Sequence, residues 1–143
     1  MPSSCVRGLR EAIDLLVLAG AATMPMQRDL PTREAVDAYA ANQQTRRLPT
    51  LDANDLWHQV NASWDYDPSA ELERIAAPMT WINSADDFIN PPEPGLSETL
   101  VPRIRGVRYR LIPASVDGHG HGTHTWASFW KDDLVALLWR SER

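Results

Sequence analysis

The sequence has little of what usually commits a chain to a particular chemistry. Its single cysteine, Cys5, excludes an internal disulfide and a cysteine-based metal cluster. The net charge is -5 and the basic residues are scattered, so we expect no nucleic-acid partner. No apolar run is long enough to span a bilayer, and we expect no membrane insertion. The length of 143 residues and the 43% hydrophobic content are ordinary for one globular domain.

The apolar run Leu15–Ala22 has two interpretations. Arginines precede it, as basic residues precede the core of a signal peptide. Glu11 and Asp14 interrupt the approach to the run, however, which argues against export. The apolar residues also recur at the spacing of one helix face: Leu9, Ile13, Leu16 and Val17. We therefore predict a packed helix from about Leu9 to Ala22, which stops near Met24–Pro25, and a cytoplasmic protein.

The first half of the chain is expected to be helical. Thr32 can cap a helix that runs to about Gln44, and Asp52 can cap a helix from Asn54 to Ala62. Proline after Asp67 predicts a further short helix that ends at Ala76. No strand pattern occurs before this point, so residues 1–76 are predicted to form one helical region.

The second half changes to an alternation of strands and helices. The apolar run Pro78–Asn83 predicts a buried strand, a helix follows from about Gly95 to Val101, and Tyr109–Ile112 predicts a second strand. A C-terminal helix is expected from near Thr123, with one apolar face: Trp126, Phe129, Trp130, Leu134, Leu137 and Leu138. This order is typical of an α/β fold with parallel strands. Because two parallel strands are a small sheet, we expect the end of a larger fold or a module that packs on a partner.

Acidic residues and histidines follow the two predicted strands. The loop after the first strand contains Asp86 and Asp87, and the loop after the second contains His119, His121 and His124. The carboxyl ends of adjacent parallel strands lie close together, so an acid from one loop can orient an imidazole from the other. A carboxylate and an imidazole in this arrangement form the acid–base half of a catalytic triad.

Other interpretations of the same residues, as structural residues or as metal ligands, remain open. Asp86 and Asp87 can be a capping and turn pair, and His119 can be a solvated loop residue. The three histidines together with Asp117 can also be taken as metal ligands. We favour no metal, because two of the histidines lie in a glycine-flanked loop rather than on a rigid element, and no further ligand set accompanies them.

Three motifs give the chain a resemblance to a known family. Asp65-Tyr66-Asp67-Pro68, the loop from Asp86 to Glu93, and Gly120-His121-Gly122-Thr123-His124 resemble the homoserine O-acetyltransferase-like group of α/β-hydrolases. The resemblance implies that residues 77–143 are the C-terminal β-α-β-α part of that fold and that residues 1–76 are cap-like helices. It also implies that Asp87 is the triad acid and His121 the triad base, with Asp86 and His124 as the less favoured choices.

The resemblance further implies acyl transfer or ester hydrolysis through a serine acyl-enzyme, with no bound cofactor and with an acyl-CoA such as acetyl-CoA as co-substrate. The expected partners are a small-molecule acyl donor and acceptor. The chain departs from the family in lacking the Gly-x-Ser-x-Gly nucleophile elbow, since Ser84 and Ser115 are expected in loops. We therefore expect a chain that is inactive alone and is completed by an N-terminal portion or in a homodimer. The alternative is a non-catalytic interaction module.

Overall fold

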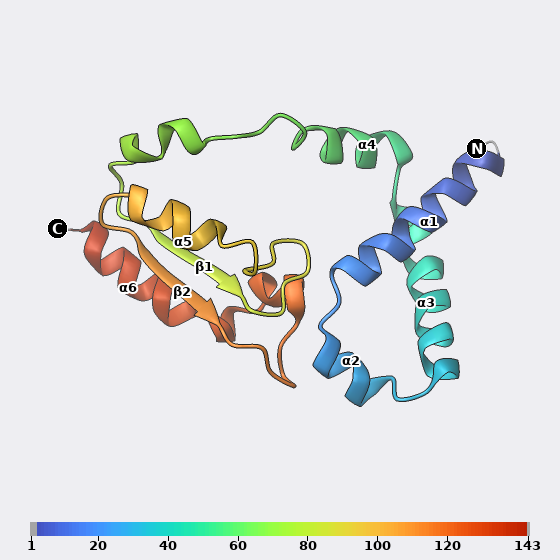
Figure 1. Ribbon diagram of the computed structural model, residues 1–143. Coiled ribbons are helices and arrows are strands. Elements are labelled where there is room, and N and C mark those ends of the chain that lie inside the picture. Colours follow the sequence, from blue (N-terminus) through green and yellow to red (C-terminus); the bar gives the residue numbers. More distant parts are fainter. Residues whose placement is uncertain (1–2, 143) are drawn as a thin grey trace. The chain divides into compact units, whose positions relative to one another are not determined.

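The structure is a computed structural model that describes residues 3–142 (Figure 1). Side chains are described from residue 6 onward. The side chain of Cys5 therefore lies outside the described part of the chain. Among the described residues, 3–19 with 26–66 form one compact unit, and 20–25 with 67–142 form a second. None of the helices in this part of the chain is long and apolar enough to cross a membrane.

The first unit is built around helices α1 (Ser3–Ala19) and α3 (Arg33–Arg47), which pack on each other. The predicted stripe on α1 is confirmed: Leu9 and Ile13 are buried, with 4% and 0% of their surfaces exposed. The amide of Gln44 on α3 donates to both carboxylate oxygens of Asp14 on α1, at 2.8 Å each. Apolar burial and this polar contact therefore join the same two helices.

Side-chain caps set the starts of two helices, as the sequence predicts. Thr32 Oγ1 accepts a hydrogen bond from the Ala35 amide at 3.2 Å and begins α3. Asp52 Oδ1 accepts from the amide of Asn54 at 2.8 Å and begins α4 (Ala53–Asn61). These caps occupy amide groups that have no acceptor inside the helix.

The end of the first helix was predicted wrongly. Helix α1 ends at Ala19, just before Gly20, and a separate helix α2 (Thr23–Asp29) contains Pro25. Proline in the first turn of a helix costs little, because an amide at that position has no intrahelical acceptor in any case. Pro25 therefore lies near the start of α2 and does not mark the end of α1.

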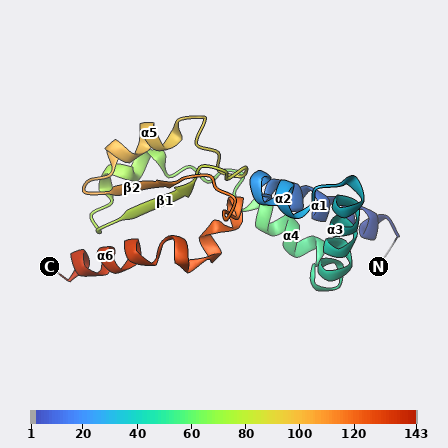
Figure 2. The same ribbon diagram turned by 90° about the horizontal axis from the view of Figure 1, so that it is seen from below.

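The second unit contains a two-stranded parallel sheet, which confirms the α/β class. Strand β1 (Thr80–Ser84) pairs with β2 (Arg108–Ile112) in the register that sets Thr80 beside Arg108. Figure 2 shows helix α5 (Leu96–Leu100) on one face of the sheet and α6 (Lys131–Ser141) on the other. Two short 3-10 segments, Ser69–Arg74 and Val101–Arg103, complete this part of the unit, so the helix expected to run through Ala76 ends earlier.

Polar side chains attach α6 to the sheet. Arg140 donates to Thr80 Oγ1 at 2.8 Å and to the carbonyl oxygen of Met79 at 3.2 Å. Arg110 on β2 pairs with Asp133 on α6 and also donates to a main-chain carbonyl before the helix. On the opposite face, the rings of Trp81 and Tyr109 meet edge to face with centroids 6.0 Å apart. Polar contacts therefore hold α6 on one face of the sheet, and an aromatic contact joins the two strands on the other face.

The C-terminal helix begins later than the sequence predicts. Helix α6 begins at Lys131, and two 3-10 segments, Gly120–Thr125 and Ala127–Phe129, replace the expected helical turns. Trp126 between them has an extended backbone, and the Trp130 indole N–H donates to the His124 carbonyl oxygen at 3.0 Å. These contacts keep the segment out of an α-helix, although its aromatic residues have helical spacing. The predicted apolar face is therefore broken, and Leu134 and Leu138 on α6 are exposed.

Candidate active site

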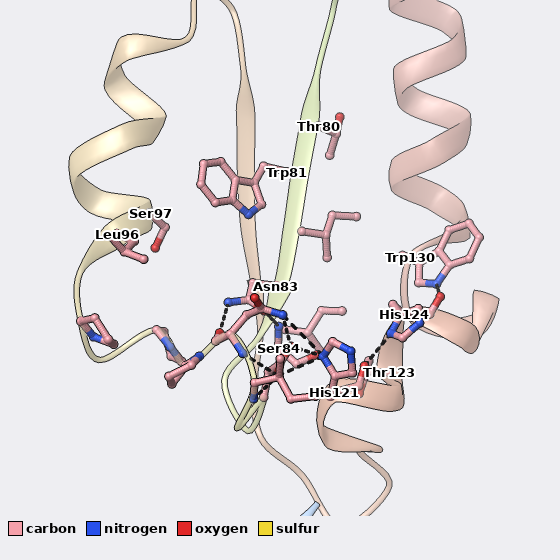
Figure 3. Close-up of a pocket in the computed structure, with 18 residues that line it drawn as sticks. Thr80, Trp81, Asn83, Ser84, Leu96, Ser97, His121, Thr123, His124 and Trp130 are labelled. Atoms are coloured by element: carbon pink, nitrogen blue, oxygen red, sulfur yellow. Dashed lines mark hydrogen bonds and ion pairs between the residues drawn. The ribbon is translucent and has the colours of Figure 1, made fainter. Parts of the chain in front are cut away.

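A cavity of about 580 Å³ lies at the carboxyl end of β1 in the second unit. Its volume is within the range of small-molecule sites. Residues of both predicted loops line it, as do apolar side chains from the sheet and its flanking helices; among them are Trp81, Leu96 and Trp130. Figure 3 shows His121 beside Asn83 and Ser84 at the tip of β1. Substrates of α/β proteins bind at this end of the strands.

Asp87 is held in a tight turn directly after β1. Its amide donates to the Ser84 carbonyl oxygen at 3.2 Å, and its Oδ1 accepts from the amides of Ile89 at 2.8 Å and Asn90 at 2.9 Å. An aspartate that binds amides further along its own chain in this way fixes both the turn and its own rotamer. The side chain is buried, with 7% of the residue exposed. The carboxylate is therefore fixed in position before any ligand binds.

His121 contacts the other side of this carboxylate. Its Nδ1 lies 3.0 Å from Asp87 Oδ2 and 3.2 Å from Oδ1. The imidazole comes from the 3-10 segment Gly120–Thr125, in which Gly120 has a φ of 55° that favours glycine. A carboxylate accepts from an N–H, so the contact favours the neutral tautomer with the proton on Nδ1.

The hydrogen bonds to Asp87 also determine its protonation. Burial, the largest effect, raises the pKa of the carboxyl group, but hydrogen bonds from the Asn90 amide, the His121 ring and the Ile89 amide together outweigh it. The pKa of Asp87 is therefore lowered from its ordinary value. Asp87 is a carboxylate at neutral pH and can stabilise a positive charge that forms on the imidazole.

The second ring nitrogen of His121 is free to react. Within residues 3–142, Nε2 makes no hydrogen bond, and the side chain is 33% exposed on the wall of the cavity. An imidazole that is oriented through Nδ1 and open at Nε2 can take a proton from a bound hydroxyl group or water.

The alternative acid, Asp86, and the alternative base, His124, form no hydrogen bond with each other in the described part of the chain. His124 binds the carbonyl oxygen of His121 through its own Nδ1 at 2.6 Å, and its ring lies 5.1 Å from the His121 ring. Asp86 has a buried Oδ2 without a hydrogen-bond partner in the described part of the chain. Asp87 and His121 are thus the predicted pair that the structure brings into contact. Asp87 also makes a turn, as the interpretation of Asp86 and Asp87 as a capping and turn pair predicts.

His119 differs from its prediction as a solvated loop residue. Its ring stacks on Trp126 with centroids 4.1 Å apart and meets Phe129 edge to face at 5.9 Å. Its amide donates to Thr123 Oγ1 at 3.1 Å. The ring is therefore part of an aromatic cluster that supports the loop. In the described residues, no group of three or more His, Cys, Asp or Glu side chains could hold a metal ion.

Sequence reasoning missed two supporting residues, Asn90 and Thr123. Asn90 donates to Asp87 from its main-chain amide at 2.9 Å and from its side-chain amide at 3.5 Å, and no local sequence pattern reveals this role. Thr123 is only 1% exposed and accepts from the His119 amide. Its place in the Gly-His-Gly-Thr-His motif was the only available signal.

Ser84, expected in a loop, is the last residue of β1 and is buried. A turn follows it, and the next helix, α5, starts only at Leu96. A nucleophile elbow requires a helix immediately after the strand. Residues 3–142 therefore contain no such elbow at this position.

Replacing the buried Thr123 with valine is expected to lower the free energy of unfolding by about 1–3 kcal/mol, because the His119 amide loses its acceptor while the side-chain volume is kept. Urea denaturation measures the change. Thr125→Val is the matched control, since Thr125 Oγ1 donates to the Gly122 carbonyl oxygen on the exposed side of the same segment. Equal losses in the two variants would contradict a specific role of Thr123.

Comparisons with known protein families, with curated proteins and with solved structures each found no match for the chain. The fold and the site define an α/β protein with an oriented aspartate–histidine pair at the carboxyl end of its strands. A relation to α/β-hydrolases is a proposal that depends on the motifs and on this pair.

Proposed function

We propose that the chain supplies the acid–base pair of an acyl-transfer centre of the α/β-hydrolase type, similar to homoserine O-acetyltransferases. One observation carries the proposal: His121 Nδ1 lies 3.0 Å from a buried Asp87 carboxylate, and the His121 side chain lines a cavity. The carboxylate is ionised, fixed by two main-chain amides and located at the strand ends, as this chemistry requires.

In the proposed reaction, Nε2 of His121 removes the proton from an attacking hydroxyl as its oxygen bonds to the acyl carbonyl carbon. The imidazolium that forms is stabilised by the Asp87 carboxylate. It then returns the proton to the leaving group as the tetrahedral intermediate collapses. Asp87 keeps its negative charge throughout, in agreement with its lowered pKa.

The nucleophile and the oxyanion hole are the parts that residues 3–142 do not provide. We infer that a serine on another polypeptide segment completes the centre, since no strand-to-helix elbow is present in the described part of the chain. Trp81, Leu96 and Trp130 give the cavity apolar walls suited to an acyl group. By resemblance the donor is an acyl-CoA and the acceptor a small hydroxyl compound. The proposal includes a cytoplasmic location.

A second candidate function is a non-catalytic interaction module. The observation that favours it is the outer edge of β1, which pairs with no strand among the described residues. An exposed strand edge is a template for pairing with another chain. In this case the Asp87–His121 contact would stabilise the loops and would perform no proton transfer.

Hydrolysis of p-nitrophenyl acetate by the purified chain distinguishes the two functions. This activated ester needs little help from an oxyanion hole, so an oriented base acting on water is sufficient for slow turnover. The chain alone is still expected to catalyse no acyl transfer, because the serine is missing. The proposed base predicts only slow hydrolysis of this activated ester above the buffer rate, dependent on His121 and not on His124. An interaction module predicts the buffer rate for the wild type and for every variant.

A further inference from the structure

The wall of the cavity at β1 carries almost no charge. Among the described residues, 18 line the cavity, and none of them is a lysine or an arginine. Asp87 is the only acidic residue on the wall, and its carboxylate is buried and ionised. The only other side chains of the wall that titrate are the imidazoles of His121 and His124. The fixed charge of the cavity is therefore negative, which disfavours an anionic group inside it.

The arginine that approaches the cavity does not line it. Arg140 donates to Thr80 Oγ1 at 2.8 Å, to the Met79 carbonyl oxygen at 3.2 Å and to the Gly106 carbonyl oxygen at 3.4 Å. Its Nε is buried. The guanidinium thus makes its hydrogen bonds with oxygens of the chain itself. Since Arg140 is not among the lining residues, it is no direct partner for an anion in the cavity.

Polar groups on the wall do not replace a cation. The Asn83 side chain donates to the Asn90 carbonyl oxygen and accepts from the Ser84 amide, at 2.8 Å each. Ser97 Oγ donates to a carboxylate oxygen of Glu98 at 3.1 Å. The main-chain groups on the outer edge of β1 alternate between amides and carbonyls, so they concentrate no positive charge. Apart from the two imidazoles, the wall therefore offers no group that carries positive charge.

The rest of the wall is mainly apolar. It includes two tryptophans, three isoleucines, three prolines and a leucine. Figure 3 shows Trp81 on the side of α5 and Trp130 at the start of α6. A group inside the cavity therefore meets apolar surface from more than one element, which favours an apolar ligand.

The cavity is also large for the smallest acyl groups. Its volume of about 580 Å³ is about four times the roughly 150 Å³ of an apolar cavity that holds benzene. All five residues of β1, Thr80–Ser84, line it, so it extends about 13 Å along the strand at about 3.3 Å per residue. An acetyl group would fill only a small part of this space. The dimensions suit an acyl chain of several carbons or an aromatic acyl group.

We propose that the cavity selects an uncharged acyl group larger than acetyl and rejects an acyl chain that ends in a carboxylate. The inference rests on the proposed function, in which Asp87 and His121 act on the acyl group, and it adds the chemical class of that group. An apolar chain is removed from water in the cavity, which is favourable. A carboxylate loses its hydration there without gaining a cation. The phosphates of an acyl-CoA donor would then lie outside the cavity.

Two matched esters test the selection: p-nitrophenyl hexanoate and mono-p-nitrophenyl adipate. Their acyl chains have equal length and end in a methyl group and a carboxylate. We expect the His121-dependent kcat/KM to be at least about tenfold higher for the hexanoate, because an unpaired carboxylate is costly to bury. It should also exceed that of p-nitrophenyl acetate, by up to about fourfold for each methylene buried. A hexanoate that reacts no faster than the adipate or the acetate would overturn the proposal.

A cation placed on the wall should weaken the selection. Leu96 lines the cavity and is exposed, so an arginine can replace it without disturbing the core. Leu96→Arg should raise kcat/KM for the adipate at least about fivefold, the effect of unit charges about 4 Å apart in water. Leu96→Gln controls for shape. Leu138→Arg controls for net charge, since Leu138 is exposed and does not line the cavity. No gain in Leu96→Arg, or an equal gain in either control, would overturn selection by charge.

Binding without reaction separates this proposal from the proposed function. Hexanamide and adipamate have the same matched chains but no ester, so their binding needs no base. We expect hexanamide to shift the indole N–H NMR signals of Trp81 and Trp130, and not that of the exposed Trp64 in the first unit. Adipamate should shift them less at equal concentration. Selective binding of hexanamide without ester hydrolysis would contradict the proposed function and support the selection. Unshifted Trp81 and Trp130 signals would overturn the selection, even if the esters were hydrolysed.

Discussion

His121→Ala is expected to remove nearly all of the p-nitrophenyl acetate hydrolysis that the chain catalyses above the buffer rate. His121 lines the cavity, its Nε2 makes no hydrogen bond within the described residues, and Asp87 orients the ring through Nδ1. A positioned general base contributes about 10²–10⁴-fold to a reaction of this type. Since the serine and the oxyanion hole are not supplied by these residues, the absolute rate should remain far below that of a complete acyl-transfer enzyme.

His124→Ala is the matched control for this experiment. His124 is exposed, lines the same cavity and has a ring 5.1 Å from that of His121, but it binds a main-chain carbonyl and not a carboxylate. Its removal should leave most of the hydrolysis unchanged. Equal losses in the two variants would show non-specific imidazole catalysis, and a wild type at the buffer rate would contradict a working base.

Asp87→Asn is expected to lower the free energy of unfolding at neutral pH by about 1–3 kcal/mol. The amide oxygen of asparagine can still accept from Ile89 and Asn90, but the charge-assisted part of these bonds and of the His121 contact is lost. Because the pKa of Asp87 is lowered in the folded chain, the stabilisation is present above the ordinary aspartate pKa and is lost as pH falls through the folded pKa. The gap between wild type and variant should therefore close at acid pH.

Urea denaturation at a series of pH values measures this gap. Asp86→Asn is the control, because Asp86 is adjacent in the chain and its buried Oδ2 has no hydrogen-bond partner among the described residues. We expect Asp86→Asn to cost less stability than Asp87→Asn at neutral pH, because Asp86 Oδ2 accepts no hydrogen bond among the described residues. A gap for Asp87→Asn that stayed constant down to acid pH would contradict an ionised Asp87 as its source.

Local patterns were sufficient to predict the caps and the buried stripe. Thr32 and Asp52 cap helices through bonds to amides two or three residues away, so the short segment around each contains the whole interaction. The burial of Leu9 and Ile13 follows from their spacing on one helix face. The approach of Asp87 to His121 follows from a simple topological rule, that adjacent parallel strands end at the same edge.

The C-terminal helix was predicted wrongly because specific side-chain contacts within the loop decided its local structure. The residues after Thr123 have helical spacing, but the stacking of His119 on Trp126 and the bond from the Trp130 indole hold them in 3-10 turns. These contacts join residues six and seven positions apart, and helical periodicity takes no account of them. The helix end predicted near Pro25 was wrong for another reason. Proline occurs both after the end of a helix and in its first turn, and here Pro25 lies in the first turn of α2.

The central claim is that Asp87 fixes the tautomer of His121 so that Nε2 is free to act as a base. Long-range proton–nitrogen NMR correlation of the imidazole rings tests it most directly, because it shows which nitrogen of each neutral ring carries the proton. We expect the proton of neutral His121 on Nδ1 in the wild type, and a loss of this preference in Asp87→Asn. A neutral His121 that carries its proton on Nε2 in the wild type would contradict the account.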